Sequence, residues 1–99
     1  MFNENITKEE QSEMILANTT EELVRMTVDE VISKMDMCSC EICKLNACAI
    51  ALNNLEPHYV TTTRGRLIAK IITLKMNHHT EVLVEVTKAL LIVKKNPLH

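Results

Sequence analysis

Apolar residues recur at helical spacing in several stretches of the chain, and this pattern predicts an all-α fold. The stretch "ANTTEELVRMTVDEVISKMD" repeats them at intervals of four, three and four residues, which makes one apolar stripe between charged positions: Val24, Val28, Val31 and Met35. Thr19 is predicted to cap this helix, because Glu22 follows it at the spacing of a capping box. The first predicted helix of this pattern therefore starts near residue 19.

Two further helices are predicted in the middle of the chain. The segment "CKLNACAIALNNL" is rich in alanine and leucine, which are good helix formers. Pro57 then favours an extended exit through "PHYVTTT", and Gly65 is expected to supply a turn. The following segment, "RLIAKIITLKMNHH", has a helical pattern with an apolar face that includes Leu67, Ile68, Ile71 and Ile72.

The two ends of the chain are less clear from the pattern. Residues 1–17 are expected to be an N-terminal arm or a short helix through Met14, Ile15 and Leu16. In residues 80–95 the alternation of valines favours a strand, whereas a three-and-four spacing that ends at Val93 favours a helix. Length favours the helix, with Thr80 as its cap and two lysines near its C-terminus.

Composition narrows the class of protein. Ninety-nine residues make one domain, assigned to residues 18–96, and only 2% of the chain is aromatic, so the core must be aliphatic. A core of about four to five small helices with one-sided stripes gains from a symmetric homodimer. The net charge of −2 argues against direct nucleic-acid binding, and no apolar run is long enough to span a membrane. The N-terminus has no signal-peptide pattern, so we expect a cytoplasmic protein with reduced thiols.

All four cysteines lie within eleven residues, and they predict a metal site. Cys38, Cys40 and Cys43 have the spacing C-x-C-x2-C at the start of a helix, where three thiolates can point to one zinc ion. Cys48 is the fourth candidate ligand, but it lies about 140° around the helix from Cys43. Its position on an apolar stripe favours packing in the core. A histidine (His78 or His79), a water molecule or a partner group are the alternatives for the fourth ligand.

Catalysis has little support in the sequence. Cys40 and Cys43 have the C-x-x-C spacing of thiol redox enzymes, but no βαβ pattern surrounds them, and Glu41 between them would raise a thiol pKa. No nucleophile–base–acid set, glycine-rich phosphate loop or H-E-x-x-H motif occurs. The sequence therefore predicts a protein that is not an enzyme.

The cysteine cluster and the segment after it resemble the late-competence ComFB family of small bacterial proteins. The likeness covers about residues 18–67, and its compound motif is Cys38, Cys40, Cys43, Ala51, Leu52, Asn53, Leu55, Pro57 and Tyr59. This resemblance implies an all-α homodimer linked to late competence, with zinc held by cysteines in some members. It also implies a receptor for a cyclic dinucleotide, c-di-GMP or c-di-AMP, with ligand contacts at Lys44, Asn46, His58 and Tyr59.

Two of these four positions depart from the family pattern. Asn46 stands where the family has an aspartate, and His58 stands where it has an arginine. An arginine offers a planar, always-charged fork that histidine lacks, and Arg64 is the nearest spare source of phosphate donors. Two functions follow: a regulatory receptor for a cyclic dinucleotide with a zinc site, or a zinc-stapled dimeric module that binds a protein partner without a nucleotide.

Overall fold

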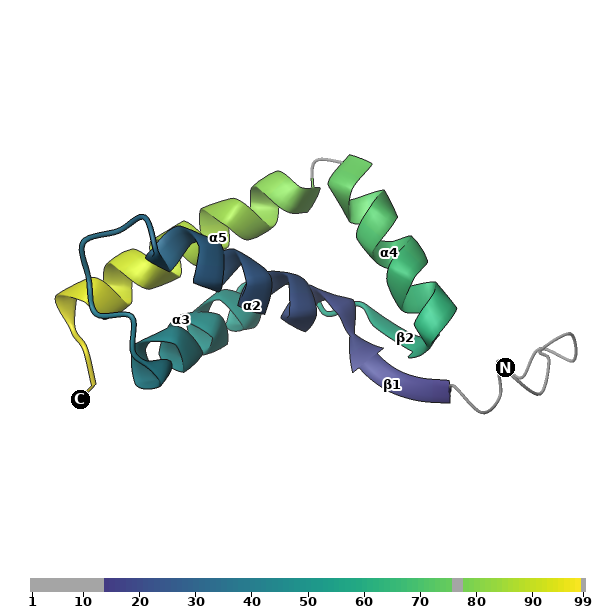
Figure 1. Cartoon of the computed structure of the whole chain (residues 1–99), viewed down its shortest axis with the longest axis horizontal. Helices are drawn as coiled ribbons and strands as arrows, with labels where there is room; N and C mark the ends of the chain where they lie inside the picture. Colours follow the sequence, from purple (N-terminus) through teal and green to yellow (C-terminus); the bar gives the residue numbers. More distant parts are fainter. Residues whose placement is uncertain (1–13, 76–77, 99) are drawn as a thin grey trace, which may run out of the picture.

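The computed structural model describes residues 14–75 and 78–98. Three helices form the body of the molecule: α2 (Thr19–Ile32), α3 (Glu41–Asn53) and α5 (His78–Lys95). A fourth helix, α4 (Thr63–Lys75), lies at one end beside a two-stranded ribbon of β1 (Met14–Asn18) and β2 (Tyr59–Thr62) (Figure 1). The loop between α2 and α3, which carries Cys38 and Cys40, lies at the opposite end (Figure 1).

The core is aliphatic and lies where α2, α3 and α5 meet. Val24 and Val28 of α2 and Leu90 of α5 are completely buried. The residues of α3 that join them are small, chiefly Ala47 and Ala51, and they let the backbones approach closely. This arrangement confirms the expectation of a core built almost without aromatic side chains.

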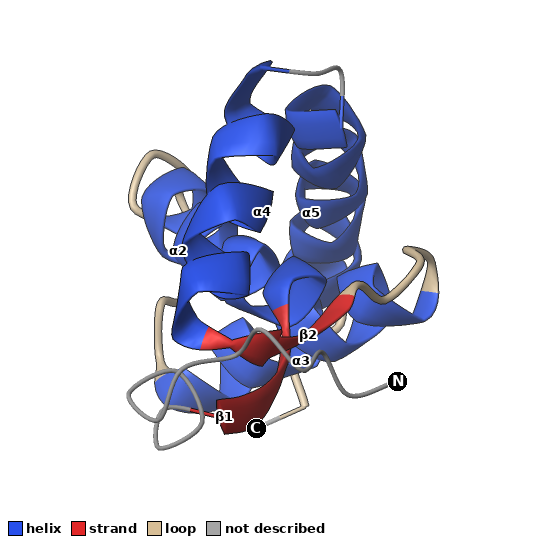
Figure 2. Cartoon of the chain, turned by 90° about the vertical axis from the view of Figure 1, so that its right-hand side faces the viewer, coloured by secondary structure: helices blue, strands red, loops and turns tan. Residues whose placement is uncertain are grey.

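The ribbon corrects the all-α prediction. Residues Met14–Asn18 were expected to be an arm or a short helix, but they pair antiparallel with Tyr59–Thr62 (Figure 2). Asn18 pairs with Tyr59 and Met14 with Thr62, with an irregularity between Met14 and Ala17. A short apolar segment adopts whichever structure satisfies its backbone groups, and here a distant strand supplies the hydrogen bonds.

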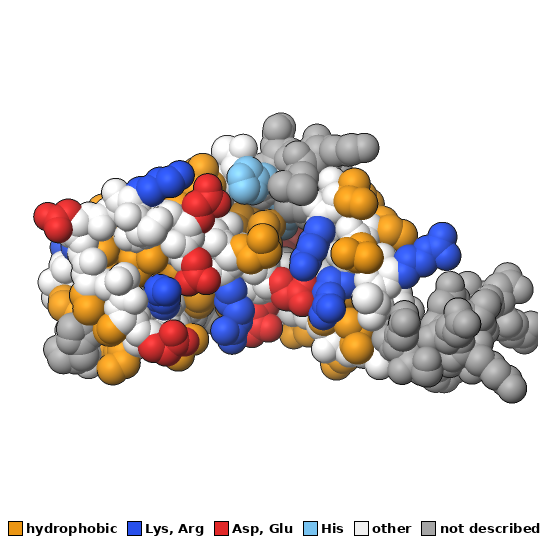
Figure 3. Space-filling view, viewed as in Figure 1, with side chains coloured by type: hydrophobic (Ala, Val, Ile, Leu, Met, Phe, Trp, Pro, Cys, Tyr) orange, Lys and Arg blue, Asp and Glu red, His pale blue; other side chains and the backbone are white. Residues whose placement is uncertain are grey.

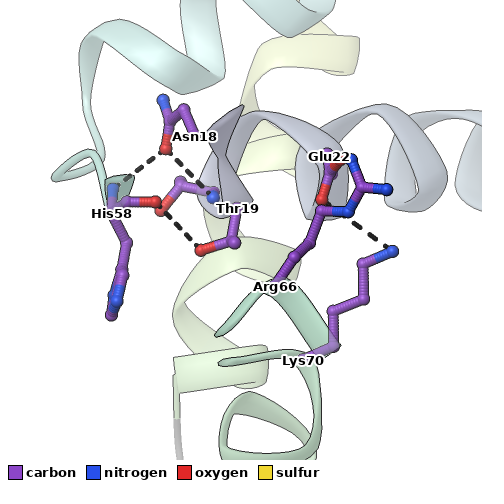
Figure 4. Close-up of polar contacts among 7 residues, drawn as sticks. Asn18, Thr19, Glu22, His58, Arg66 and Lys70 are labelled. Atoms are coloured by element: carbon purple, nitrogen blue, oxygen red, sulfur yellow. Dashed lines mark hydrogen bonds and ion pairs between the residues drawn. The ribbon is translucent and has the colours of Figure 1, made fainter. Parts of the chain in front are cut away.

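A polar clamp fastens the start of α2 to the segment before β2 (Figure 4). The side-chain oxygen of Asn18 accepts hydrogen bonds from the amides of Thr20 (3.1 Å) and His58 (2.9 Å). The carbonyl of His58 accepts the amide of Thr19 at 2.7 Å and its hydroxyl at 3.1 Å. Asn18 is therefore the N-cap of α2, and the prediction of a Thr19 cap is wrong.

Gly65 lies inside α4, so the predicted turn at this residue is wrong. Its amide donates to the Thr62 hydroxyl at 2.9 Å, and a Cβ on Gly65 would lie 3.0 Å from that oxygen. The glycine thus serves a close approach at the start of the helix.

The C-terminal segment is helical, which confirms the helix prediction for residues 80–95 over the strand. The helix begins at His78, two residues before Thr80, so the predicted cap at Thr80 is wrong. None of the helices in the described part of the chain has the length and apolarity needed to cross a membrane.

Helix α4 turns its small residue inward and its large aliphatic residues outward. Ala69 is buried, and Glu22 of α2 binds Arg66 at 3.1 Å and Lys70 at 3.8 Å (Figure 4). Four side chains on the rest of the helix form what we call the α4 apolar face; they are Leu67, Ile68, Ile71 and Ile72, each 46–57% exposed. Hydrophobic side chains lie open to solvent over α4 beside a patch of mixed charge (Figure 3).

Candidate metal centre and ligand-binding residues

The structure brings three cysteines to one point, as the sequence predicts. The sulfur atoms of Cys38, Cys40 and Cys43 lie within 4.8 Å of one another, and we call them the cysteine triad. Residues 33–40 form a loop without helix or strand, and α3 begins directly after it. Cys40 is the N-cap residue of α3, and its carbonyl accepts the amide of Lys44 at 3.0 Å. The start of the helix therefore fixes the last two sulfurs relative to each other.

The three thiols sit at different depths. Cys38 is exposed, Cys40 is half-buried and Cys43 is buried among core residues at 1% exposure. The amide of Cys43, followed by the thiol of Cys38, lowers the pKa of Cys40. Loss of solvation, together with its hydrogen bonds to the other two thiols, raises the pKa of Cys43 to about 11. The triad thus combines one thiol whose pKa is lowered with one whose pKa is raised.

The donor set fits a zinc ion. Thiolates about 2.3 Å from a tetrahedral zinc ion lie roughly 3.8 Å apart, so the triad at 4.8 Å or less needs only a small contraction. Cys38 lies on the loop, which can make that adjustment. A positive ion would also favour ionised Cys43, because the metal charge offsets the loss of solvation.

Cys48 lies apart from the triad. It is 7% exposed and packs in the hydrophobic core, and burial raises its pKa. The triad is the group of possible metal ligands that the described residues bring together, and it includes neither Cys48 nor His78 or His79. The Nδ1 of His78 instead lies 3.4 Å from the Glu81 carboxylate, at the start of α5.

Lys44 and Asn46 follow the triad on α3 but face different surroundings. The Lys44 ammonium lies 3.2 Å from Asp29 of α2. Asn46 lines a pocket of about 300 Å³ between α3 and α5, with Asn53 and Asn96 also on its wall. Lys44 and Asn46 were expected to contact the same ligand, but they have different neighbours although both lie on α3.

His58, Tyr59 and Arg64 lie beyond the other end of α3. His58 lines a pocket of about 230 Å³ under α4, and its backbone is held by the polar clamp. Tyr59 is 62% exposed on β2, and Arg64 is exposed in the first turn of α4. Within a single chain the predicted ligand residues are therefore dispersed: Lys44 and Asn46 lie on α3, and His58, Tyr59 and Arg64 lie beyond its end.

Sequence reasoning missed the polar residues that position these groups. Asn18 orients the backbone of His58, and Glu22 ties α2 to Arg66 and Lys70. Asn18 carried a signal, because asparagine is a preferred N-cap and stands directly before the helix. The sequence pattern explained Glu22 as a capping-box residue, so its ion pairs with Arg66 and Lys70 were not predicted.

Comparison with known proteins agrees with the geometry. The family model described as late competence development protein ComFB matches residues 17–97. The chain is 25% identical over 84 residues to the competence protein ComFB of Bacillus subtilis (strain 168), covering 84% of this chain and 86% of that protein. A solved structure of the late competence protein ComFB from Bacillus subtilis superposes with a TM-score of 0.77 at 25% identity, over 84% of this chain and 92% of that one.

Proposed function

The chain belongs to the late competence development protein ComFB family, and from that premise we propose that it is a cytoplasmic, non-enzymatic regulatory protein that holds zinc and binds a partner. The observation that carries this proposal is the convergence of three cysteine sulfurs at the start of α3. The triad lies where a helix, a loop and the core meet. Its role is therefore structural.

Zinc at the triad would fasten the loop of residues 33–40 to the core. Cys43 belongs to the buried cluster, and Met35 and Met37 of the loop pack against the same cluster. A zinc ion bound by both Cys38 and Cys43 would cross-link the loop to helix α3 and contribute folding free energy. The loop would then present one fixed surface to a partner.

The fourth zinc ligand comes from Cys48, a histidine, a water molecule or a partner. Cys48 would have to leave the core to take part. The histidines considered from the sequence, His78 and His79, lie outside the triad. A His78→Ala/His79→Ala variant tests the histidine alternative.

The working form is proposed to be a homodimer that joins through the α4 apolar face. Helix α4 packs its buried Ala69 toward its own chain and leaves four aliphatic side chains about half exposed on the other side. Such an exposed apolar face is typical of a surface that packs against a partner. A second copy supplies a matching apolar face around a two-fold axis.

Thermal unfolding tests the zinc staple. We expect chelator-treated protein to melt at a lower temperature than zinc-loaded protein and to recover when zinc returns, because zinc binds the folded state. Cys48→Ser tests Cys48 as the fourth ligand; because Cys48 packs in the core apart from the triad, we expect this variant to keep the zinc-dependent shift. Equal melting temperatures with and without zinc would refute the staple.

A second candidate is a cyclic dinucleotide receptor, and the exposure of Tyr59 favours it. A tyrosine that is 62% exposed offers a flat face on which a nucleobase can stack. Lys44 and Asn46 lie about 13 Å and about 10 Å along α3 from its last residue, Asn53. A complete site would therefore be assembled from two chains of the homodimer.

Calorimetry on zinc-loaded protein tests this candidate with c-di-GMP and c-di-AMP separately. Binding that weakens strongly in Tyr59→Ala, and not in Met26→Ala on α2, would support the receptor. If neither nucleotide gives heat of binding or a thermal shift, the receptor function is refuted. The function would then be that of a zinc-stapled module that binds a protein partner.

A further inference from the structure

The cysteine triad has an exposed side and a buried side, and this difference has a chemical consequence. Cys38 is exposed on the loop and Cys40 is half-buried beside it, whereas Cys43 is closed off in the core. A small oxidant from solvent can therefore reach Cys38 and Cys40, but Cys43 is shielded.

We propose that Cys38 and Cys40 form a modification site at which a peroxide-class oxidant makes a reversible disulfide and thereby displaces the metal. The two sulfurs are within 4.8 Å in the metal-free geometry, and a disulfide needs about 2.05 Å. The Cys38 sulfur would move toward the Cys40 sulfur to close this distance, because Cys38 lies on a loop and not in a helix or strand.

The reaction balances with hydrogen peroxide as the oxidant. The Cys40 sulfur attacks one peroxide oxygen, the O–O bond breaks, and the products are a sulfenic acid and one water molecule. The Cys38 sulfur then attacks the Cys40 sulfur, the S–O bond breaks, and the hydroxide leaves with the thiol proton as a second water molecule. The two thiols lose two electrons and two protons in total, and a dithiol reductant reverses the change.

Cys43 is the alternative partner for Cys40, and packing argues against it. Cys43 lies in the first turn of α3, and its side chain is among the largest that are completely buried. Moving its sulfur toward Cys40 would open a gap in a core built of small residues, which costs stability. Cys38 makes the same bond by moving an exposed loop.

The effect on the metal follows from ligand count, and this step rests on the proposed zinc site. A disulfide sulfur is no longer a thiolate ligand, so oxidation removes two of the three sulfurs and leaves Cys43 alone. The loop of residues 33–40 then loses its staple. The protein would couple the oxidation state of its surroundings to the shape of this one surface.

The experiment uses the full chain, loaded with zinc and treated with hydrogen peroxide. Zinc release is followed with a chromogenic zinc reagent, and the disulfide is followed by intact mass as a loss of two hydrogen atoms. Cleavage after Lys34, Glu41 and Lys44 separates Cys38 and Cys40 from Cys43. We expect the disulfide within the fragment that ends at Glu41, with zinc release at the same rate and recovery of both after reduction.

Two variants separate this proposal from the zinc staple. Cys43→Ser should weaken zinc binding but still form the disulfide, whereas Cys38→Ser should lose the disulfide; Cys48→Ser should match the unmodified chain. A bond that links the Cys40 and Cys43 fragments, or equal oxidation of Cys38→Ser, would overturn the proposal. If untreated protein holds no zinc, the staple fails and the mass measurement still decides whether the disulfide forms.

Discussion

The α4 apolar face gives a prediction whose size can be worked out from the structure. Ile68 and Ile71 are 46% and 53% exposed, on a helix whose buried side is already occupied by Ala69. Replacing both with glutamate removes the apolar surface without touching the core or the Glu22 ion pairs. If the face joins two copies, the Ile68→Glu/Ile71→Glu variant should be monomeric.

The magnitude follows from the exposed fractions. Burying a whole isoleucine side chain is worth about 1.5–3 kcal/mol, so burying the remaining half is worth about 1 kcal/mol. Two residues in each of two chains give about 4 kcal/mol, which corresponds to roughly a thousandfold weaker dimer. The cost of burying glutamate charges adds to this figure.

Sedimentation velocity over a range of concentrations measures the effect. The unmodified chain should sediment as a dimer and the double variant as a monomer with unchanged circular dichroism. Leu91→Glu is the matched control, because Leu91 is 47% exposed in the C-terminal half of α5, and that end of the helix lies at the opposite end of the molecule from α4 (Figure 1). An unmodified chain that sediments as a monomer, or a double variant that still sediments as a dimer, would refute the proposal that this face joins two copies.

Three further predictions concern the core, the clamp and the triad. Leu90→Ala should lower the free energy of unfolding by about 2–5 kcal/mol in urea titrations, because Leu90 is fully buried, whereas the half-exposed neighbour change Leu91→Ala should cost under about 1 kcal/mol. Asn18→Ala should cost about 1–2 kcal/mol in the same assay, since it removes the α2 cap and the bond to the His58 amide, and no loss would count against the clamp. In metal-free protein Cys40 should alkylate before Cys43, whose pKa is raised to about 11. The pKa of Cys43 is higher in the folded state than in the unfolded state, so the protonated Cys43 thiol stabilises the fold fully below pH 9. This contribution to the free energy of unfolding is lost as the pH rises toward 11, and Cys43→Ser should lack this pH dependence.

Local pattern predicted the helices well, because their apolar stripes persist over several turns. The strand Met14–Asn18 was missed because its structure depends on pairing with Tyr59–Thr62, more than forty positions away in the chain. Thr19 and Asn18 illustrate the same point at a cap. Either residue can cap a helix, and the distant amide of His58 makes Asn18 the better partner.

The candidate site divides in the same way. The cysteine triad was predictable, since its spacing at a helix start is enough to bring three sulfurs together. The burial of Cys48 was also favoured by its stripe position. Lys44 on α3 and Tyr59 on β2 lie on different elements, and no local pattern in the sequence encodes how far apart the fold places them.

Native mass spectrometry of protein purified without chelator tests the central claim most directly. The account predicts one zinc ion per chain, retained in Cys48→Ser and lost or strongly weakened in Cys43→Ser. Loss of zinc in a His78→Ala/His79→Ala variant as well would identify a histidine as the fourth ligand. A chain that carries no zinc, or a Cys43→Ser variant that holds zinc as firmly as the unmodified protein, would contradict the account.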